Sequence, residues 1–302
     1  MMKLKSDYIK KKMKSKIGLA IPCFNNLDVI KKSLPAVYSD KFLVVLFDDG
    51  STDGTKEWVQ ANYPNIEILS GDGENWWTGS LAKAIDFCLA NECDYVVSIN
   101  ADVLISPKIV QRLIEVSIDN GNAIVASMVV DIDNPDTILW SGSKFKKIHK
   151  LVPIYSPRYI VKAGNKVNKL SDLPFEVDEV HGRGVLIPRS AFEILGNYDG
   201  YTFPHYGGDN DFSFRAKRHG IKMLVDPLSI ARVHIGNTSL NLSEHSSFWR
   251  RLGSIKNYLF VRKNGEAVFV WWKLYRKHLP PLYFLQSYIF ILILNVYRRL
   301  GN

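Results

Sequence analysis

The stretch FLVVLFDDGSTDGTKEWVQAN, residues 42–62, decides the fold. It consists of an apolar run of strand length at 42–47, the acidic turn DDGSTDG at 48–54 and a helix-period segment at 55–62. An apolar run that ends in Gly and Asp residues and leads into a helical pattern is typical of a buried strand followed by a helix. The sequence therefore predicts a strand–turn–helix unit with three aspartates in its turn.

The same alternation occurs on both sides of this unit. Apolar runs at 17–22, 66–69 and 95–99 precede helical patterns at 27–38, 79–91 and 107–117. Such alternation predicts right-handed βαβ units and an α/β fold with a mostly parallel sheet and helices on both faces. Ligands bind outside the carboxyl ends of such strands, so the turns PCFNN, DDGSTD and NAD should meet in one crevice.

The pattern is less regular beyond residue 124. Short strands are expected at 180–188, 221–226 and 230–234, and the basic stretch 144–169 is expected to form a loop or hairpin. We divide the chain into a basic segment (1–16), a catalytic domain (17–247, with halves 17–123 and 124–247) and a helical C-terminal extension (248–302).

Charge is distributed unevenly over the 302 residues, of which 46% are hydrophobic and 23% charged. Residues 1–16 have a net charge of +6 and residues 250–302 of +9, whereas the body between them has −6. An acidic body lacks the basic face that a nucleic-acid groove needs, so no nucleic-acid partner is expected. Basic ends instead suit attachment to an anionic membrane surface. The three cysteines lack the spacing of a disulfide framework or zinc site, which fits a reducing cytosol.

Two carboxylates, Asp209 and Asp211, open the basic amphipathic helix predicted in YGGDNDFSFRAKRHG, residues 206–220. A carboxylate at a helix start is stabilised by unpaired backbone N–H groups and the helix dipole. One interpretation is a helix cap beside a solvated aspartate. The other is a general base that stays ionised at neutral pH.

Six motifs in order resemble the family 2 glycosyltransferases. They are IPCFNN (21–26), FDDGSTDGT (47–55), INAD (99–102), GRGVLIPRSAFEILGNYDG (182–200), GDNDFSFRAKRHG (208–220) and RVHIGNTS (232–239). The resemblance covers roughly residues 15–265. It implies the GT-A fold and an inverting, nucleotide-sugar-dependent transferase of the hexosyltransferase type, similar to rhamnosyltransferase-like bacterial members.

The resemblance also implies a donor site. Asp49 would accept the ring N–H of uracil or thymine, while Asp48 could hold the turn and Asp53 could cap the helix at 55–62. The donor-binding residues implied by the motifs are Pro22, Cys23, Asn25, Asp49, Asn75, Trp77, Gly79, Asn100 and Asp102. The paired tryptophans Trp76 and Trp77 could equally be core residues.

A divalent cation, Mg²⁺ or Mn²⁺, is implied as cofactor, held by Asp102 and His234. Such a cation neutralises the developing charge of a departing diphosphate. Asn100 replaces the first aspartate of the family's metal motif, where an amide can still hydrogen-bond the ribose. A structural His234, or a plain turn at 100–102, is the alternative.

The implied catalytic base is Asp209, although Gly208 replaces the glutamate that usually precedes it. Asp211 is expected to anchor the helix or to contact the acceptor, and Arg215 to pair with one of the two aspartates. His181, Gly182 and Arg183 are implied to bind the acceptor or the donor diphosphate.

We therefore expect transfer from a UDP- or dTDP-linked sugar, such as rhamnose, to a glycan or lipid-linked glycan of the cell envelope, in cell-surface polysaccharide synthesis. The rival functions are a nucleotidyltransferase, an inactive sugar-binding homologue and an adaptor that uses the basic ends. The uncharged stretch 279–297 is either a buried helix or a monotopic anchor that keeps a cytoplasmic enzyme on the inner face of the membrane. A homodimer is compatible with this interpretation.

Overall fold

The structure is a computed structural model that describes residues 15–147, 155–159, 164–165, 167, 171–234 and 268–301. Most of the basic N-terminal segment, residues 235–239 of the RVHIGNTS motif and residues 248–267 of the predicted extension lie outside these ranges. The predicted domain boundaries therefore stay predictions.

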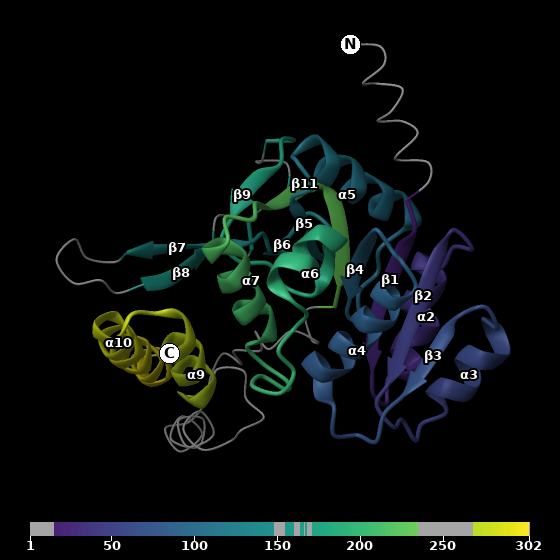
Figure 1. The fold of residues 1–302 in the computed structure, drawn as a ribbon, viewed down its shortest axis with the longest axis horizontal. Coiled ribbons are helices and arrows are strands. Elements are labelled where there is room, and N and C mark those ends of the chain that lie inside the picture. Colours follow the sequence, from purple (N-terminus) through teal and green to yellow (C-terminus); the bar gives the residue numbers. More distant parts are fainter. Residues whose placement is uncertain are drawn as a thin grey trace, which may run out of the picture.

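Nine strands of the described residues form one sheet, in the order β3-β2-β1-β4-β10-β5-β11-β9, with β6 paired to β5 (Figure 1). Every residue of β1, β4 and β5 is buried, as expected for strands covered on both faces. The strands are β1 (Ile17–Cys23), β2 (Phe42–Asp48), β3 (Glu67–Ser70), β4 (Tyr95–Ile99), β5 (Ile124–Asp131), β6 (Ile138–Trp140), β9 (Phe175–Val177), β10 (Arg183–Pro188) and β11 (Met223–Val233).

The two halves of the sheet differ in strand direction. The pairs β3–β2, β2–β1 and β1–β4 are all parallel, as predicted. Beyond β4 the sheet is mixed, because β10 runs antiparallel to both β4 and β5 while β11 is parallel to β5. The strands expected at 221–226 and 230–234 are one strand, β11, with a register shift after Asp226. Arg112 binds the buried carboxylate of Asp226 at this shift, at 2.6 and 3.0 Å.

Helices flank the sheet: α4 packs on β1, β2 and β4, and α5 packs on β5, β10 and β11. α4 begins at Trp76, three residues before the predicted start. The basic stretch after residue 142 forms a hairpin of β7 (Ser143–Lys147) and β8 (Tyr155–Tyr159), one of the two predicted forms. The helices of this body are α2 (Leu27–Val37), α3 (Thr55–Asn62), α4 (Trp76–Ala90), α5 (Pro107–Asp119), α6 (Arg189–Leu195) and α7 (Gly208–Arg218).

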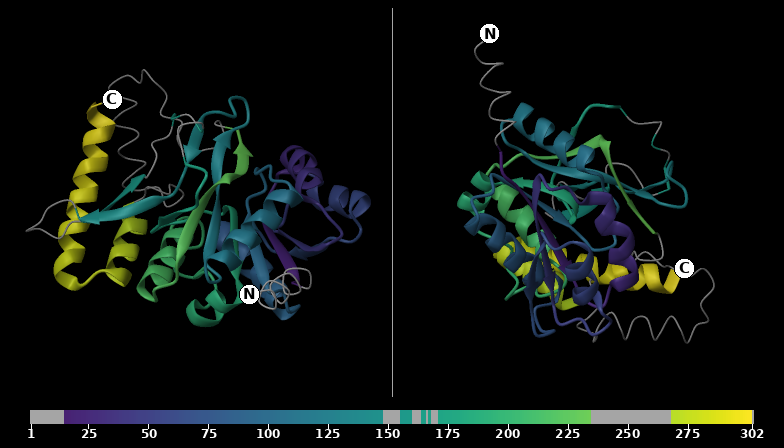
Figure 2. Two further views of the ribbon diagram at one scale, coloured as in Figure 1. Left: turned by 90° about the horizontal axis from the view of Figure 1, so that it is seen from above. Right: turned by 90° about the vertical axis from the view of Figure 1, so that its right-hand side faces the viewer.

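The C-terminal helices α9 (Val268–His278) and α10 (Pro281–Gly301) lie at the end of the molecule remote from β3 (Figures 1 and 2). α9 packs on α7 and buries Leu274 and Tyr275 completely. The ring of Trp272 in α9 meets the rings of Phe284 and Tyr288 in α10 at 4.5 and 5.0 Å. Among the described residues, no helix combines the length and apolarity needed to cross a bilayer.

Candidate active site

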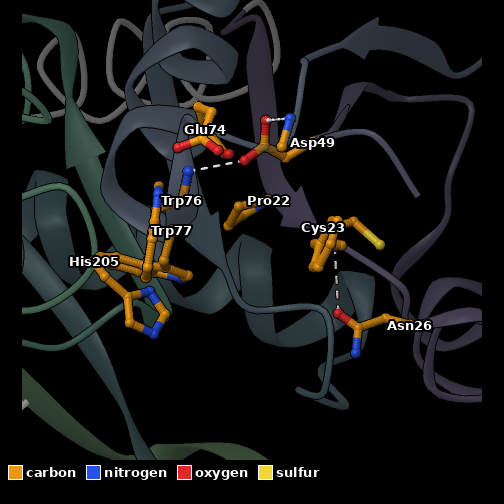
Figure 3. A pocket seen from close by; sticks show the side chains of 11 residues that line it. Pro22, Cys23, Asn26, Asp49, Glu74, Trp76, Trp77 and His205 are labelled. Atoms are coloured by element: carbon orange, nitrogen blue, oxygen red, sulfur yellow. Dashed lines mark hydrogen bonds between the residues drawn. The ribbon is translucent and has the colours of Figure 1, made fainter. Parts of the chain in front are cut away.

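The carboxyl ends of β1, β2 and β4 meet at one edge of the sheet, and a cavity of about 490 Å³ opens there (Figure 3). Its walls come from the end of β1 and the turn after it, the turn after β2, the loop between β3 and α4, the start of α4 and the loop before α7. The lining residues are Pro22, Cys23, Phe24, Asn26, Asp49, Gly73, Glu74, Trp76, Trp77, Ser80 and His205. The predicted convergence of the polar turns is therefore confirmed for this part of the site.

Asp49 organises the cavity wall. Its Oδ1 accepts hydrogen bonds from the Gly73 N–H at 3.1 Å and the Asn75 amide at 2.7 Å. Its Oδ2 accepts the Trp76 N–H at 2.8 Å (Figure 3). The last bond holds Trp76 at a φ of 55°, which is unusual for a bulky residue. Gly71 leaves room for this arrangement, because a Cβ there would collide with the Asp49 carboxylate.

The neighbouring aspartates hold the turns. Asp48 accepts the Ser51 N–H at 3.0 Å. Asp53 accepts the N–H and hydroxyl of Thr55 at 3.1 and 2.6 Å and the Leu27 N–H at 2.9 Å. Asp53 therefore binds the first residue of α3, but the cap position expected for it is occupied by Gly54.

Four of the residues predicted to bind the donor line the cavity in this position: Pro22, Cys23, Asp49 and Trp77. Burial, followed by the charges of Asp48 and Asp53, raises the pKa of the Cys23 thiol to about 12, so it stays protonated. Asn25, Asn75 and Gly79 are not among the lining residues, but each contacts the turns or the helix that form the cavity wall.

The supporting roles of these three residues are distinct. Asn25 accepts the Thr52 N–H at 2.8 Å and so links the turns after β1 and β2. Asn75 donates to Asp49 and Asp72 and accepts a hydrogen bond from Lys83. Gly79 packs against Gly200, where a Cβ would lie only 2.8 Å from the Gly79 Cα, whereas a Cβ on Gly79 itself would meet Asn75 at an ordinary 3.5 Å.

Trp77 connects the donor cavity to the INAD turn. Its indole N–H donates to Asn100 Oδ1 at 2.9 Å, and the Asn100 N–H donates to the Gly182 carbonyl at 3.0 Å. A Cβ on Gly182 would lie 2.5 Å from the Trp77 ring. Position 182 therefore has no room for a side chain, and the close packing of Gly182 against Trp77 places the His181–Arg183 turn at the site.

Asp102 and His234 lie near each other. Leu104 and Arg232 exchange two backbone hydrogen bonds of 2.9 Å, which join the loop after Asp102 to the strand end before His234. Burial raises the pKa of Asp102, while the charges of Arg183 and His234 act in the opposite direction. His234 Nδ1 lies 3.2 Å from Asp133 Oδ2. No cluster of three His, Cys, Asp or Glu side chains suited to a metal ion occurs in the described ranges.

Asp209 lies at the start of α7, after Gly207 at a φ of 89°. A Cβ on Gly208 would lie 2.5 Å from the Thr78 side chain, so the glutamate usual at that position has no room here. Asp209 Oδ2 accepts the Gly182 N–H at 3.3 Å, whereas its Oδ1 is buried without a hydrogen-bond partner among the described residues. Burial raises the pKa of Asp209 to about 6, against the charges of His181 and Arg183.

Asp211 has the opposite environment. It is fully buried and accepts Arg215 at 2.9 Å, the predicted i,i+4 pair, as well as Lys277 at 2.7 Å and His278 at 2.8 Å from α9. Burial alone would raise the pKa of Asp211, but the hydrogen bonds from His278 and Lys277 lower it to about 2. Of the two roles expected for Asp211, these contacts support the anchor.

Three polar residues outside the predicted set lie at the site. His205 lines the donor cavity, with its ring 5.5 Å from that of Trp76. The Tyr198 hydroxyl is buried without a hydrogen-bond partner among the described residues, and the charge of Asp209 contributes to its raised pKa, after burial. Glu179 binds His181, with 3.5 Å between Oε1 and Nε2. His205 lies four residues before Asp209 and Glu179 two before His181, so proximity to the motifs was the available signal.

Comparison with known proteins agrees with the resemblance to the family 2 glycosyltransferases. The family described as "Glycosyl transferase family 2" matches residues 19–194, more than half of the chain. The chain belongs to this family. It is a glycosyltransferase.

The relatives agree with this membership. The N-acetylglucosaminyl-diphospho-decaprenol L-rhamnosyltransferase of Mycobacterium tuberculosis, from strains CDC 1551 / Oshkosh and ATCC 25618 / H37Rv, is 24% identical over 239 residues. The match covers 68% of this chain and 76% of the relative. The crystal structure of GalNAc-T7 with UDP, GalNAc and Mn²⁺ has a TM-score of 0.55 at 14% identity, over 91% of this chain. This chain spans about half of that structure (54%). The structural likeness supports the GT-A fold.

Proposed function

We propose that this glycosyltransferase transfers the sugar of a nucleoside diphosphate sugar to an acceptor hydroxyl with inversion of configuration at the anomeric carbon. Asp209 is the base that deprotonates this hydroxyl. The observation that carries the proposal is the buried Asp209 Oδ1, which has no hydrogen-bond partner among the described residues and needs a donor. An acceptor hydroxyl meets that need. A pKa of about 6 leaves the carboxylate mostly ionised at neutral pH and still basic enough to take a proton.

The donor would occupy the cavity between Pro22 and His205. A carboxylate offers about four lone-pair directions, and Asp49 uses three of them within the wall. The fourth remains for the ring N–H of uracil or thymine. Trp76, Trp77 and His205 would enclose the sugar end of the cavity, since aromatic rings suit the apolar faces of sugars.

The chain fits a divalent cation in part. Asp102, with His234 beside it, would hold Mg²⁺ or Mn²⁺, and oxygens of the donor diphosphate would complete the ligand set. The bound cation would act as a Lewis acid toward the leaving diphosphate. Arg183 lies close enough to influence both Asp102 and Asp209, so it adds positive charge between the donor and acceptor sides.

The acceptor would be a lipid-linked glycan of the cell envelope, as the name of the mycobacterial relative suggests, and the donor a dTDP- or UDP-linked sugar such as rhamnose. A thermal-shift screen of UDP-, dTDP- and GDP-sugars, with and without Mn²⁺, tests the donor, because a ligand of the native state stabilises it. Stabilisation by one nucleotide class that Asp49→Ala abolishes supports the proposed donor site. Hydrolysis of the selected donor then distinguishes an enzyme from an inactive homologue.

Peripheral attachment to the inner face of the membrane is the second part of the proposal. α10 exposes Leu285, Ile289 and Ile293, four residues apart and therefore on one face, with 44–61% of their surface accessible. An exposed apolar stripe beside a net positive sequence suits an interfacial helix on anionic lipid.

Flotation with phosphatidylglycerol vesicles tests this attachment. Serine at all three stripe positions, or deletion of residues 279–302, should abolish binding and leave donor binding intact. Leu228→Ser removes an apolar side chain of similar exposure (43%) from β11 and is the matched control. Equal flotation of the stripe variant and the wild type would contradict the attachment.

A further inference from the structure

Buried residues contact the His181 ring on the acceptor side of Asp209, and 30% of the His181 side chain stays exposed. The Trp140 ring stacks on the His181 ring at 4.9 Å with an interplanar angle of 26°. Glu179, only 4% exposed, faces His181 Nε2 at 3.5 Å and accepts hydrogen bonds from Ser143 and Asn210. The His181 ring is therefore held in one position by an aromatic face and a carboxylate.

The same network reaches Asp209 by two routes. Asn210, which donates to Glu179, is the next residue to Asp209 in α7. Gly182, which follows His181, donates its N–H to Asp209 Oδ2 at 3.3 Å. Glu179 thus fixes His181 and the start of α7 against each other.

We propose that Glu179 is a positioning residue for the transfer reaction: it keeps His181 as an imidazolium beside Asp209, and this cation keeps the base ionised. The inference rests on the proposed role of Asp209 and extends it to a residue that does not touch the substrate. A buried carboxylate is costly unless it is paired. A neutral imidazole would leave Glu179 without its cationic partner, and of the two cations of this turn that act on Asp209 only Arg183 would remain.

The electrostatics of the site agree with the geometry. Burial alone would lower the pKa of His181, but the hydrogen bond and charge of Glu179 and the charge of Asp209 raise it above its ordinary value. The charges of His181 and Arg183 lower the pKa of Asp209 and that of Glu179 raises it. The charge of Asp209 in turn raises the pKa of the neighbouring Tyr198 hydroxyl, after burial. His181 lowers the pKa of Asp209 more than Glu179 raises it.

Because of this order, the direction in which Glu179→Gln changes the pKa of Asp209 distinguishes the possible roles of Glu179. If Glu179 acts only as a nearby negative charge, its removal lowers the pKa of Asp209. If it acts through His181, the imidazole loses its proton near neutral pH, and the pKa of Asp209 rises. A purely structural role predicts no change in the pKa of Asp209 in the folded variant.

Carbon-13 NMR of protein labelled at the aspartate carboxyl groups measures this pKa without any substrate, and Asp209→Asn identifies the resonance. We expect Asp209 to titrate near pH 6 in the wild type and about half to one pH unit higher in Glu179→Gln. Asp178→Asn removes an equal charge one residue away, where Asp178 pairs with Lys217 at 2.6 Å, and should leave the Asp209 titration unchanged. A fall or no change in Glu179→Gln overturns the proposal.

A second measurement needs no variant at position 179. Nitrogen-15 NMR of the wild-type histidines should give His181 a titration midpoint above the ordinary histidine pKa of 6.5. A midpoint below 6.5 overturns the proposal. The two proposals also fail separately. Asp209→Asn that keeps native turnover contradicts the base, whereas an inactive Asp209→Asn with an unshifted Glu179→Gln contradicts only the role of Glu179.

Discussion

Two carboxylates in the first turn of α7 show how position, rather than sequence spacing, sets chemical character. Asp209 faces the base pocket, which we define as His181, Gly182, Tyr198 and Asp209. Asp211 faces the α9 junction, defined as Asp211, Arg215, Lys277 and His278. The pKa of Asp209 is raised to about 6 and that of Asp211 is lowered to about 2.

The difference comes from the partners that each pocket supplies. The base pocket gives Asp209 one hydrogen bond, from the Gly182 N–H, and leaves Oδ1 without a partner in the described part of the chain. The α9 junction gives Asp211 three cationic or histidine partners within 2.9 Å. A carboxylate with an unfilled position can react, and a fully paired carboxylate can only hold elements together. Each prediction below tests one side of this contrast.

Asp209→Asn should have the largest effect. Loss of a general base costs about 10²–10⁴-fold in turnover, and donor affinity should stay near the wild-type value because the base acts on the acceptor. Stability should rise in the same variant. A folded-state pKa above the unfolded value means that ionised Asp209 opposes folding above pH 6, by about 1–3 kcal/mol, and asparagine removes this cost.

Turnover assays, donor titration and urea unfolding at pH 7.5 measure these effects of Asp209→Asn. Near-native turnover would contradict the assignment of the base. A large loss of stability would instead place Asp209 among the structural carboxylates, with Asp211.

Asp211→Asn should have the reverse profile. Removal of one partner from a buried ion pair costs about 3–5 kcal/mol, because the cations of α9 and α7 lose their counter-ion. Turnover at low temperature should fall by less than about tenfold, since Asp211 does not touch the substrate in our proposal. Urea unfolding combined with assays at 15 °C separates the two quantities.

Asp199→Asn is the matched control for Asp211→Asn. Asp199 also binds Lys277, at 2.8 Å, but 27% of its side chain is exposed, so the loss should stay near 1 kcal/mol. If Asp211→Asn were as stable as Asp199→Asn, the α9 junction would not be the anchor that its contacts indicate.

The pH dependence separates the two carboxylates within the native protein. kcat/KM should fall tenfold per pH unit below about pH 6, as Asp209 takes up a proton. Asp211 contributes stability at all pH values above its unfolded pKa of 3.8 and loses it as the pH falls toward 2, because its folded-state pKa is depressed. Activity should therefore fall to about a tenth by pH 5 in a protein that remains folded. An activity loss that coincides with unfolding would contradict this separation.

The sequence predicted contacts between residues that are close along the chain better than contacts between distant residues. Strands β1 to β4 follow one another with local helices between them, so the alternation of patterns along the chain was enough to assign their polar turns to one edge. The i,i+4 pair of Asp211 with Arg215 is likewise local and is confirmed. Asp53 binds the first residue of α3, although Gly54 rather than Asp53 occupies the cap position. Local periodicity and spacing carry this kind of information.

The missed features depend on distant residues. His278 binds Asp211 across 67 positions, and Ser143 binds Glu179 across 36, so no short motif contains either pair. The insertion of β10 between β4 and β5 is also a long-range pairing. The early start of α4 depends on the hydrogen bond from the Trp76 N–H to Asp49, across 27 positions.

Lys277→Met should have the smallest effect, and it ranks the partners within the α9 junction. Lys277 lies 2.7 Å from Asp211 and 5.5 Å from the centre of the Phe203 ring, but 35% of its side chain is exposed. Solvent screens a partly exposed ammonium group, and methionine keeps the apolar stem over Phe203. Arg215 and His278 still pair with Asp211 in this variant, while the partly exposed Asp199 loses the same partner as in Asp199→Asn. We therefore expect a loss of about 1 kcal/mol, close to that of Asp199→Asn.

His278→Leu gives the contrasting result within the same junction. The His278 side chain is 2% exposed, stacks on Phe214 at 4.9 Å and binds Asp211 at 2.8 Å, so its loss leaves a buried acceptor without its donor. We expect about 1–3 kcal/mol, more than for Lys277→Met, from urea unfolding of both variants at pH 7.5. The reverse order would mean that the exposed ammonium group, rather than the buried hydrogen bond, holds α9 to α7. The contrast between the base pocket and the α9 junction would then depend on charge alone, and 0.5 M salt should weaken it.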